Sequence, residues 1–194
     1  MPAKVVIPKS VLALAELAAK ESTNRFGATT AIKLTAQNGR HRCEATNGRI
    51  LGIMNGVTDK DCFGEVLVPA VSVPGIKKML NKDTTLTIIG DKDVFQANTP
   101  TAMISGQTVD GRWPATDQVL PQGAPRFSIK VDPALLITLL KCAMAINEGE
   151  PGLKEGTTVK MHFYAPNKPF VVTARANDGT TFFDGIIVPL VTSN

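Results

Sequence analysis

The sequence predicts an α+β fold built from three βαβββ half-domains, in which the helices lie on one face of antiparallel sheets. Three observations predict it. A short apolar strand, a proline and an amphipathic helix follow one another three times, and Pro8, Pro69 and Pro133 recur at intervals of 61 and 64 residues. Each helical segment is followed by short apolar runs separated by turn residues. Each helix also carries lysine opposite its apolar face.

The first repeat begins with the strand Lys4–Pro8, and the proline then starts a helix, because first-turn N–H groups have no intrahelical partner. At about 100° per residue, one face of this helix collects the apolar residues Val11, Leu14, Ala15 and Ala18. Its later strands are expected at Ala31–Ala36, Arg40–Thr46 and Arg49–Met54. The first two of them flank Asn38-Gly39, a strong hairpin signal.

The second and third repeats follow the same order. In the second repeat the leading strand is Glu65–Pro69, and the inward face of the helix carries Val73, Ile76, Met79 and Leu80. The later strands are expected at Thr84–Ile89, Val94–Asn98 and Ala102–Val109. In the third repeat the leading strand is Ser128–Pro133, and the inward face of the helix carries Leu135, Leu139, Leu140 and Ala143. The later strands are expected at Thr158–Tyr164, Phe170–Ala176 and Phe182–Leu190. Cys142 falls among the apolar residues of the last helix and is expected in the core.

The composition is that of a folded protein with no membrane anchor. Of 194 residues, 43% are apolar and 20% are charged, which excludes a disordered chain. No apolar run approaches the ~20 residues of a membrane-spanning helix, and the N-terminus has no secretory pattern. Three widely spaced cysteines do not suggest a disulfide framework. We therefore expect a cytoplasmic protein.

The sequence contains no assembled catalytic or metal motif, so we expect no enzyme activity and no cofactor. Glycine-rich phosphate loops are absent. His41 and Cys43 share one face of a predicted strand, but two ligands alone favour a half-buried strand pair over a metal site. Asp59 and Asp61 fall in a turn-like polar stretch, which is typical of solvated loop carboxylates.

The charge pattern permits nucleic-acid binding without requiring it. The net charge is only +4, and the aromatic content of 5% argues against single-strand binding by base stacking. The lysines on the outer helix faces have two interpretations, a solvated surface or a contact surface for a phosphate backbone.

Several segments resemble a known family. Residues Ala45–Leu51 (Ala-Thr-Asn-Gly-Arg-Ile-Leu) are similar to an Ala-Thr-Asp-Gly-His-Arg-Leu segment of the bacterial DNA polymerase III beta subunit, the beta sliding clamp. Val109–Pro114 with Val119–Pro121 resembles the Asp-Gly-Arg-Phe-Pro and Val-Leu-Pro stretch that closes the middle domain of those clamps. Glu65–Pro69 resembles the strand that enters the second helix of that domain, and Ile186–Leu190 resembles the Val-Met-Pro-Met ending of the family.

The resemblance implies a domain organisation and a ring. Residues 1–122 resemble a complete middle domain with halves 1–62 and 63–122, and residues 123–194 resemble a single half-domain from the end of the C-terminal domain. In such clamps the sheets lie outside and the helices line a hole for duplex DNA. Clamp rings contain twelve half-domains, so three per chain imply a homotetramer. The alternative is a dimer in which two odd half-domains complete each other.

The resemblance also implies two sets of site residues. The basic residues expected to face double-stranded DNA are Lys9, Lys20, Arg25, Lys77, Lys78, Lys82 and Lys141. The residues expected to line a hydrophobic cleft for peptides are Thr46, Gly48, Leu51, Pro114, Val119, Ile186, Val188, Pro189 and Leu190. The alternative for the second set is an ordinary core at strand ends. The sequence departs from the family at Arg49 and Ile50, where clamps have His and Arg, and at Ala70-Val71, where many have basic residues.

The expected function is therefore that of a sliding clamp, a non-enzymatic processivity factor. It would encircle duplex DNA without reading its sequence, and its cleft would bind peptides of a replicative polymerase and a clamp loader. The alternative is a clamp-like protein that engages polymerase or loader peptides without encircling DNA.

Overall fold

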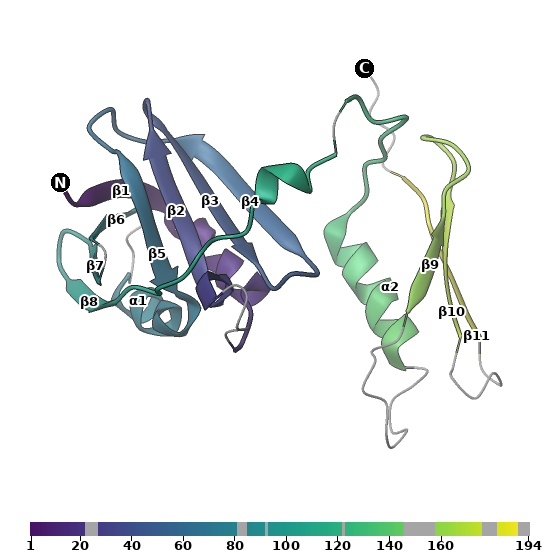
Figure 1. Ribbon diagram of the computed structural model, residues 1–194. Helices are drawn as coiled ribbons and strands as arrows, with labels where there is room; N and C mark the ends of the chain where they lie inside the picture. The colour runs from purple at the N-terminus through teal and green to yellow at the C-terminus, as the bar shows by residue number, and fades with distance from the viewer. Residues whose placement is uncertain are drawn as a thin grey trace. The chain divides into compact units, whose positions relative to one another are not determined.

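The computed structural model describes residues 1–21, 27–80, 85–91, 93–121, 123–145, 158–175 and 182–189 (Figure 1). The chain divides into two compact units, Met1–Leu120 and Pro121–Asn194. The sequence placed this division after residue 122. Within the described residues, no helix combines the length and the apolar character needed to cross a membrane.

Two four-stranded antiparallel sheets make up the first unit. The first sheet has the order β1-β6-β7-β8, and its strands are β1 (Ala3–Pro8), β6 (Thr85–Gly90), β7 (Val94–Asn98) and β8 (Met103–Gln107). The second has the order β4-β3-β2-β5, and its strands are β2 (Ala31–Gln37), β3 (Arg40–Thr46), β4 (Leu51–Val57) and β5 (Gly64–Pro69). The expected hairpin turn at Asn38-Gly39 is present, and both residues have positive φ, as a tight hairpin turn requires.

The two repeats of this unit exchange their leading strands. Strand β1 precedes the helix of the first repeat but pairs with β6 of the second, which places Val5 opposite Ile88. Strand β5 belongs to the second repeat but pairs with β2 of the first, which places Val66 opposite Leu34. Each sheet therefore contains three strands of one repeat and the leading strand of the other, so neither repeat completes its sheet alone.

Two short helices pack on the inward side of these sheets and contact each other. They are the 3-10 helix η1 (Lys9–Leu17) and the helix α1 (Val73–Met79), which follows the 3-10 turn η3 (Ala70–Ser72). Along η1, Val11, Leu14 and Leu17 recur every third residue, the spacing that a 3-10 helix stacks in one row. The two helices and both sheets share one apolar core, so the predicted α+β class is confirmed.

The second unit contains one helix and one three-stranded antiparallel sheet of order β11-β10-β9. Its elements are α2 (Pro133–Ala145), β9 (Val159–His162), β10 (Phe170–Arg175) and β11 (Phe182–Ile187). A small core gathers Phe170, Val172 and Ile187 from the sheet, with Leu136, Leu139 and Leu140 of α2 packed against it.

Three predictions for the second unit are wrong: that Leu135 faces the core, that Cys142 lies in the core, and that Ser128–Pro133 forms a strand. Ala143 is the buried residue of α2, and the positions in line with it are Leu136, Leu139 and Leu140. Leu135 and Cys142 therefore point outward, and Leu135 is 59% exposed. The leading segment Ser128–Pro133 forms no strand with any described residue. In the first unit a leading strand is held by the sheet of the other repeat, and the described part of the second unit has only one sheet.

Candidate functional site

A pocket of about 720 Å³ opens on the first unit between the β3–β4 loop and the segment that follows β8. We call residues Asp110–Val119 the closing segment. The lining comes from Thr29, from Thr46–Leu51, and from the closing segment through Arg112–Thr116, Gln118 and Val119. Two stretches more than 60 residues apart in the sequence thus form the two walls of one groove.

Side-chain-to-backbone hydrogen bonds shape the β3–β4 wall. The Thr46 hydroxyl donates to the Ile50 carbonyl at 2.6 Å and accepts from the Gly48 N–H at 3.0 Å. The Asn47 side-chain oxygen accepts from the N–H groups of Arg49 and Ile50 at 3.0 and 3.1 Å. Gly48 has φ of +87°, a conformation that glycine adopts without strain. Because this turn occupies Asn47–Ile50, β4 begins at Leu51 and not at the predicted Arg49.

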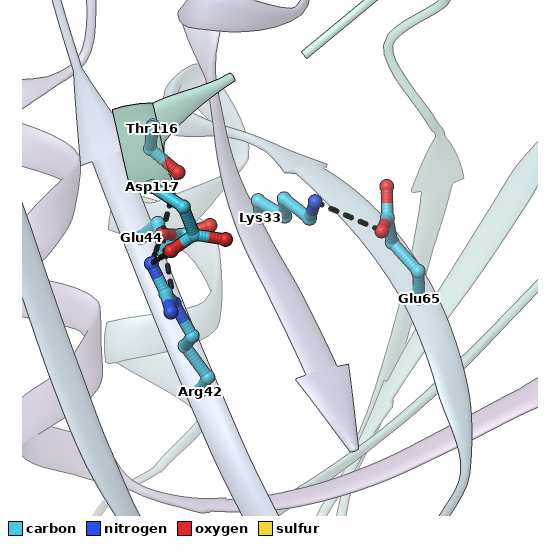
Figure 2. Close-up of polar contacts among 6 residues, drawn as sticks. All are labelled: Lys33, Arg42, Glu44, Glu65, Thr116 and Asp117. Atoms are coloured by element: carbon cyan, nitrogen blue, oxygen red, sulfur yellow. Dashed lines mark hydrogen bonds and ion pairs between the residues drawn. The ribbon is translucent and has the colours of Figure 1, made fainter. Parts of the chain in front are cut away.

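A buried carboxylate holds the opposite wall in place (Figure 2). Glu44 on β3 is 3% exposed, and one of its oxygens, Oε1, accepts from Arg42 Nε at 2.9 Å and Nη2 at 2.6 Å. The same oxygen accepts from the Thr116 hydroxyl at 2.9 Å. Arg42 also reaches Asp117 at 2.7 Å. A buried charge is stable only when it is paired and hydrogen-bonded, so this network fixes the 3-10 turn η4 (Thr116–Gln118) against β3.

These contacts keep Arg42 charged. The hydrogen bond to Glu44 raises the pKa of the Arg42 guanidinium, partial burial opposes this, and Asp117 adds to the increase. The arginine is therefore a cation that bridges β3 to the closing segment.

Two features place the start of the closing segment beside β2 and the turn before it. Lys33 Nζ lies 3.0 Å from Glu65 (Figure 2) and 5.9 Å from the centre of the Trp113 ring, within range of a cation–π interaction. Gly111 has φ of +133°, and a Cβ there would lie 3.0 Å from the backbone nitrogen of Ala28. The segment therefore passes close to the 3-10 turn η2 (Gly27–Thr30) before β2, and Thr29 of this turn lines the pocket.

The chemistry of the groove suits an extended apolar segment. Ile50 is 49% exposed and Val119 is 70% exposed, and the lining residues Leu51 and Pro114 are half-buried. Arg49 and Arg112 add two cations to the lining, and the described lining residues include no carboxylate. Apolar surface with a few polar groups is typical of a binding groove.

The structure brings five of the predicted cleft residues together: Thr46, Gly48, Leu51, Pro114 and Val119. The others belong to the second unit. Ile186 and Val188 are each 66% exposed there, Pro189 is buried, and Leu190 lies outside the described residues. Several lining residues were absent from the predicted cleft set although they stand inside the motifs already singled out: Asn47, Arg49, Ile50, Arg112 and Trp113. Ala115, Thr116 and Gln118, which lie between the two parts of the second motif, were absent as well. Sequence reasoning also missed Thr29, for which no sequence signal exists.

The described lysines of the DNA-binding set are all exposed: Lys9, Lys20, Lys77, Lys78 and Lys141. Lys9 opens η1 and Lys77 and Lys78 lie in the last turn of α1, so three of them stand on two helices in contact. Lys141 lies on α2 in the second unit. Arg25 and Lys82 lie outside the described residues.

The two potential metal ligands on β3 lie in the core. His41 and Cys43 are both buried on the inward face of β3, where burial lowers the pKa of His41 and raises that of Cys43 to about 12. Among the described residues, one group of side chains could share a metal ion, namely Asp59, Asp61 and Cys62. Asp61 is already paired with Lys4, which lowers the pKa of the carboxyl group.

With this geometry established, comparison with solved structures shows similarity to bacterial sliding clamps. The DNA polymerase sliding clamp of Bacillus subtilis aligns with a TM-score of 0.75 and 16% identity, covering 96% of this chain and 49% of that one. The sliding clamp of Pseudomonas aeruginosa gives 0.74 and 17%, covering 96% and 51%. The DNA polymerase III beta subunit of Thermotoga maritima gives 0.71 and 16%, covering 96% and 50%.

These comparisons confirm the fold that the sequence motifs suggested. The chain has the sliding-clamp fold and spans about half the length of the clamps that it resembles. No family model matches the sequence, and no curated protein sequence matches it.

Proposed function

We propose that this chain acts as a sliding clamp, a non-catalytic ring-shaped oligomer that surrounds duplex DNA and tethers a polymerase through its cleft. One observation carries the proposal: on a sliding-clamp fold, the two motif segments Thr46–Leu51 and Arg112–Val119 meet to form an apolar groove. The partners are peptides of a replicative polymerase and of a clamp loader, and the setting is the cytoplasm.

The groove supports peptide binding because hydrogen bonds within the chain organise both of its walls. Asn47 shapes one wall, and the Glu44 network holds the other. A preformed groove costs less ordering entropy when a partner binds. Exposed apolar side chains such as Val119 and Ile50 then gain burial against the large apolar residues of a linear peptide.

The peptide-binding part is tested with the fluorescence of Trp113, which lines the groove and is the single tryptophan of the chain. Short peptides with two adjacent large apolar residues should change this fluorescence in a saturable way, and the same peptides with Ser at those positions should not. Val119→Glu should weaken binding about thirtyfold, the effect of removing an interface hot spot of about 2 kcal/mol. Val57→Glu is the matched control, since Val57 is 83% exposed at the far end of β4.

The lysines on η1 and α1 support the DNA-binding part. A clamp that slides needs contacts that neutralise phosphates without reading bases, and exposed lysines on adjacent helices provide this chemistry. Lys77→Glu combined with Lys78→Glu should reduce both the affinity for duplex DNA and its dependence on salt. The double variant Lys60→Glu and Lys168→Glu changes the charge equally at exposed positions elsewhere and should leave DNA binding nearly unchanged.

For the ring itself we propose four chains, since four sets of three half-domains give the twelve implied by the resemblance. A second candidate function is a clamp-like protein that binds polymerase or loader peptides without encircling DNA. It is favoured by the location of the groove, whose lining lies entirely within one unit of one chain. Full peptide binding together with no effect of the Lys77 and Lys78 variant on DNA would select this candidate.

A further inference from the structure

In its described residues, the second unit lacks the pairing of a leading strand with a sheet that is present twice in the first unit. In the first unit, each leading strand pairs with the first strand after the helix of the other repeat, β1 with β6 and β5 with β2. In the second unit, β9 is the first described strand after α2, and it pairs with β10 on one side. Its other edge pairs with no strand that the structure describes.

The leading segment of the third repeat has the pattern of a strand but not the pairing. Ile129 and Val131 alternate with Ser128 and Lys130, as residues of a strand with one buried face do. The residues at the matching positions of the first unit, Val5 and Ile7 in β1 and Val66 and Val68 in β5, are at most 2% exposed. Ile129 and Val131 are only half-buried, and they contact the core around Phe170 without joining a sheet.

Apolar side chains are exposed on β9 and directly after it, beside the exposed Lys160 and His162. Met161 within β9 is 40% exposed, and the following Phe163 and Tyr164 are 42% and 72% exposed. Proteins normally protect such edges with charge, proline or a covering element, because unpaired backbone groups beside apolar side chains bind other strands. Within the described residues, the second unit thus contains a strand-like segment and a strand edge that each pair with no other strand.

We propose that two copies of the chain associate by exchanging these segments, so that residues 127–131 of each copy add a fourth strand to the β9 edge of the other. Each copy offers both the segment 127–131 and the β9 edge that this segment would pair with, which is the condition for a closed two-fold dimer. The occupant is a second copy because the first unit shows the same reciprocal exchange between its two repeats. This dimer does not depend on the binding of DNA or of a peptide.

The register of the exchange follows from the first unit. The middle inward residue of each leading strand faces the middle inward residue of its partner strand, Val5 with Ile88 and Val66 with Leu34. Applied to the third repeat, this rule places Ile129 opposite Met161 and Val131 opposite Val159 of the second copy. Lys130 then lies opposite Lys160 on the outer face of the sheet.

A cysteine pair tests the exchange directly. Lys130→Cys with Lys160→Cys, in a Cys142→Ser background because Cys142 is exposed, should form a disulfide between copies under mild oxidation. Most of the protein should then run as a covalent dimer on a non-reducing gel. The matched control is Lys130→Cys with Met161→Cys, whose side chains would point to opposite faces and should give little dimer.

A second variant tests the register without any crosslink. Opposed lysines weaken strand pairing, so Lys130→Glu should lower the dissociation constant of the dimer about two- to thirty-fold. Lys60→Glu, a similar charge change in the first unit, should leave it unchanged. A monomer mass for the unaltered chain at about 100 µM, or a disulfide formed within one chain, would overturn the proposal. A monomer mass would also contradict the proposed ring of four chains, whereas a disulfide within one chain would overturn the exchange alone. Peptide binding to the groove is measured separately by Trp113 fluorescence, so failure of the exchange is distinguishable from failure of the peptide-binding function.

Discussion

A single buried oxygen, Glu44 Oε1, joins the sheet to the closing segment. It accepts hydrogen bonds from Arg42 and from Thr116, so it is shared by a strand and by a groove wall 72 residues further along the chain. The recognised segment Ala45–Leu51 begins directly after this carboxylate and does not include it. Its role depends on a contact between distant segments, which a pattern along the chain does not reveal.

Glu44→Gln is expected to lower the free energy of unfolding by about 1–3 kcal/mol, because the charge that Arg42 pairs with is lost in a buried site. Urea unfolding followed by Trp113 fluorescence measures the effect on the first unit. Glu65→Gln is the control: Glu65 is 48% exposed in its pair with Lys33, so its loss should cost no more than about 1 kcal/mol. Equal costs for the two variants would contradict the structural role of Glu44.

The buried imidazole of His41 predicts a pH dependence. Burial lowers its folded-state pKa below the ordinary value of 6.5, so the unfolded chain takes up the proton first as the pH falls. The free energy of unfolding of the first unit should therefore be steady between about pH 7 and 8 and decrease as the pH falls through about 6.5. His41→Leu should remove this decrease, and His162→Asn in the second unit should retain it. An unchanged pH profile in His41→Leu would show that other groups cause the decrease.

At the scale of single elements, local signals predicted most of the first unit. Asn38-Gly39 located the hairpin of β2 and β3, and Val94–Asn98 matches β7 at both ends. The strand predicted at Ser128–Pro133 is absent, although this segment has the composition of the other leading strands. It pairs with no described sheet, and a strand forms only where it can pair. Alternation along the chain identifies a strand that can form, but its formation requires a partner edge.

The turn between β3 and β4 is the element that shapes one wall of the groove. Gly48 has positive φ with no atom near its missing Cβ, so Gly48→Ala should cost about 1 kcal/mol of backbone strain without a clash. The strain should displace the turn and weaken peptide binding measured by Trp113 fluorescence. Gly123→Ala is the matched control, since Gly123 in the second unit has φ of +88° and equally open space. A loss of peptide affinity in both variants would show that the turn geometry is not the cause.

At the scale of the whole molecule, two sets of interactions are proposed to combine. Reciprocal exchange at the β9 edge would join two chains, and two such pairs would contain the twelve half-domains implied for a closed ring. The exposed lysines of η1, α1 and α2 would then supply diffuse contacts to phosphates, and the grooves of the first units would remain available to peptides. The sequence motifs indicated the fold and part of the groove, whereas assembly depends on surfaces that meet only between chains.

The measurement that tests this account most directly is topological retention on DNA. The protein is allowed to thread onto a linear duplex, the ends are ligated, and the sample is washed in high salt, which removes charge-based binding. We expect protein to remain on the ligated circle, to be released when a single cut reopens it, and to be lost from the unligated duplex. Equal loss from circle and linear duplex would contradict a ring around DNA.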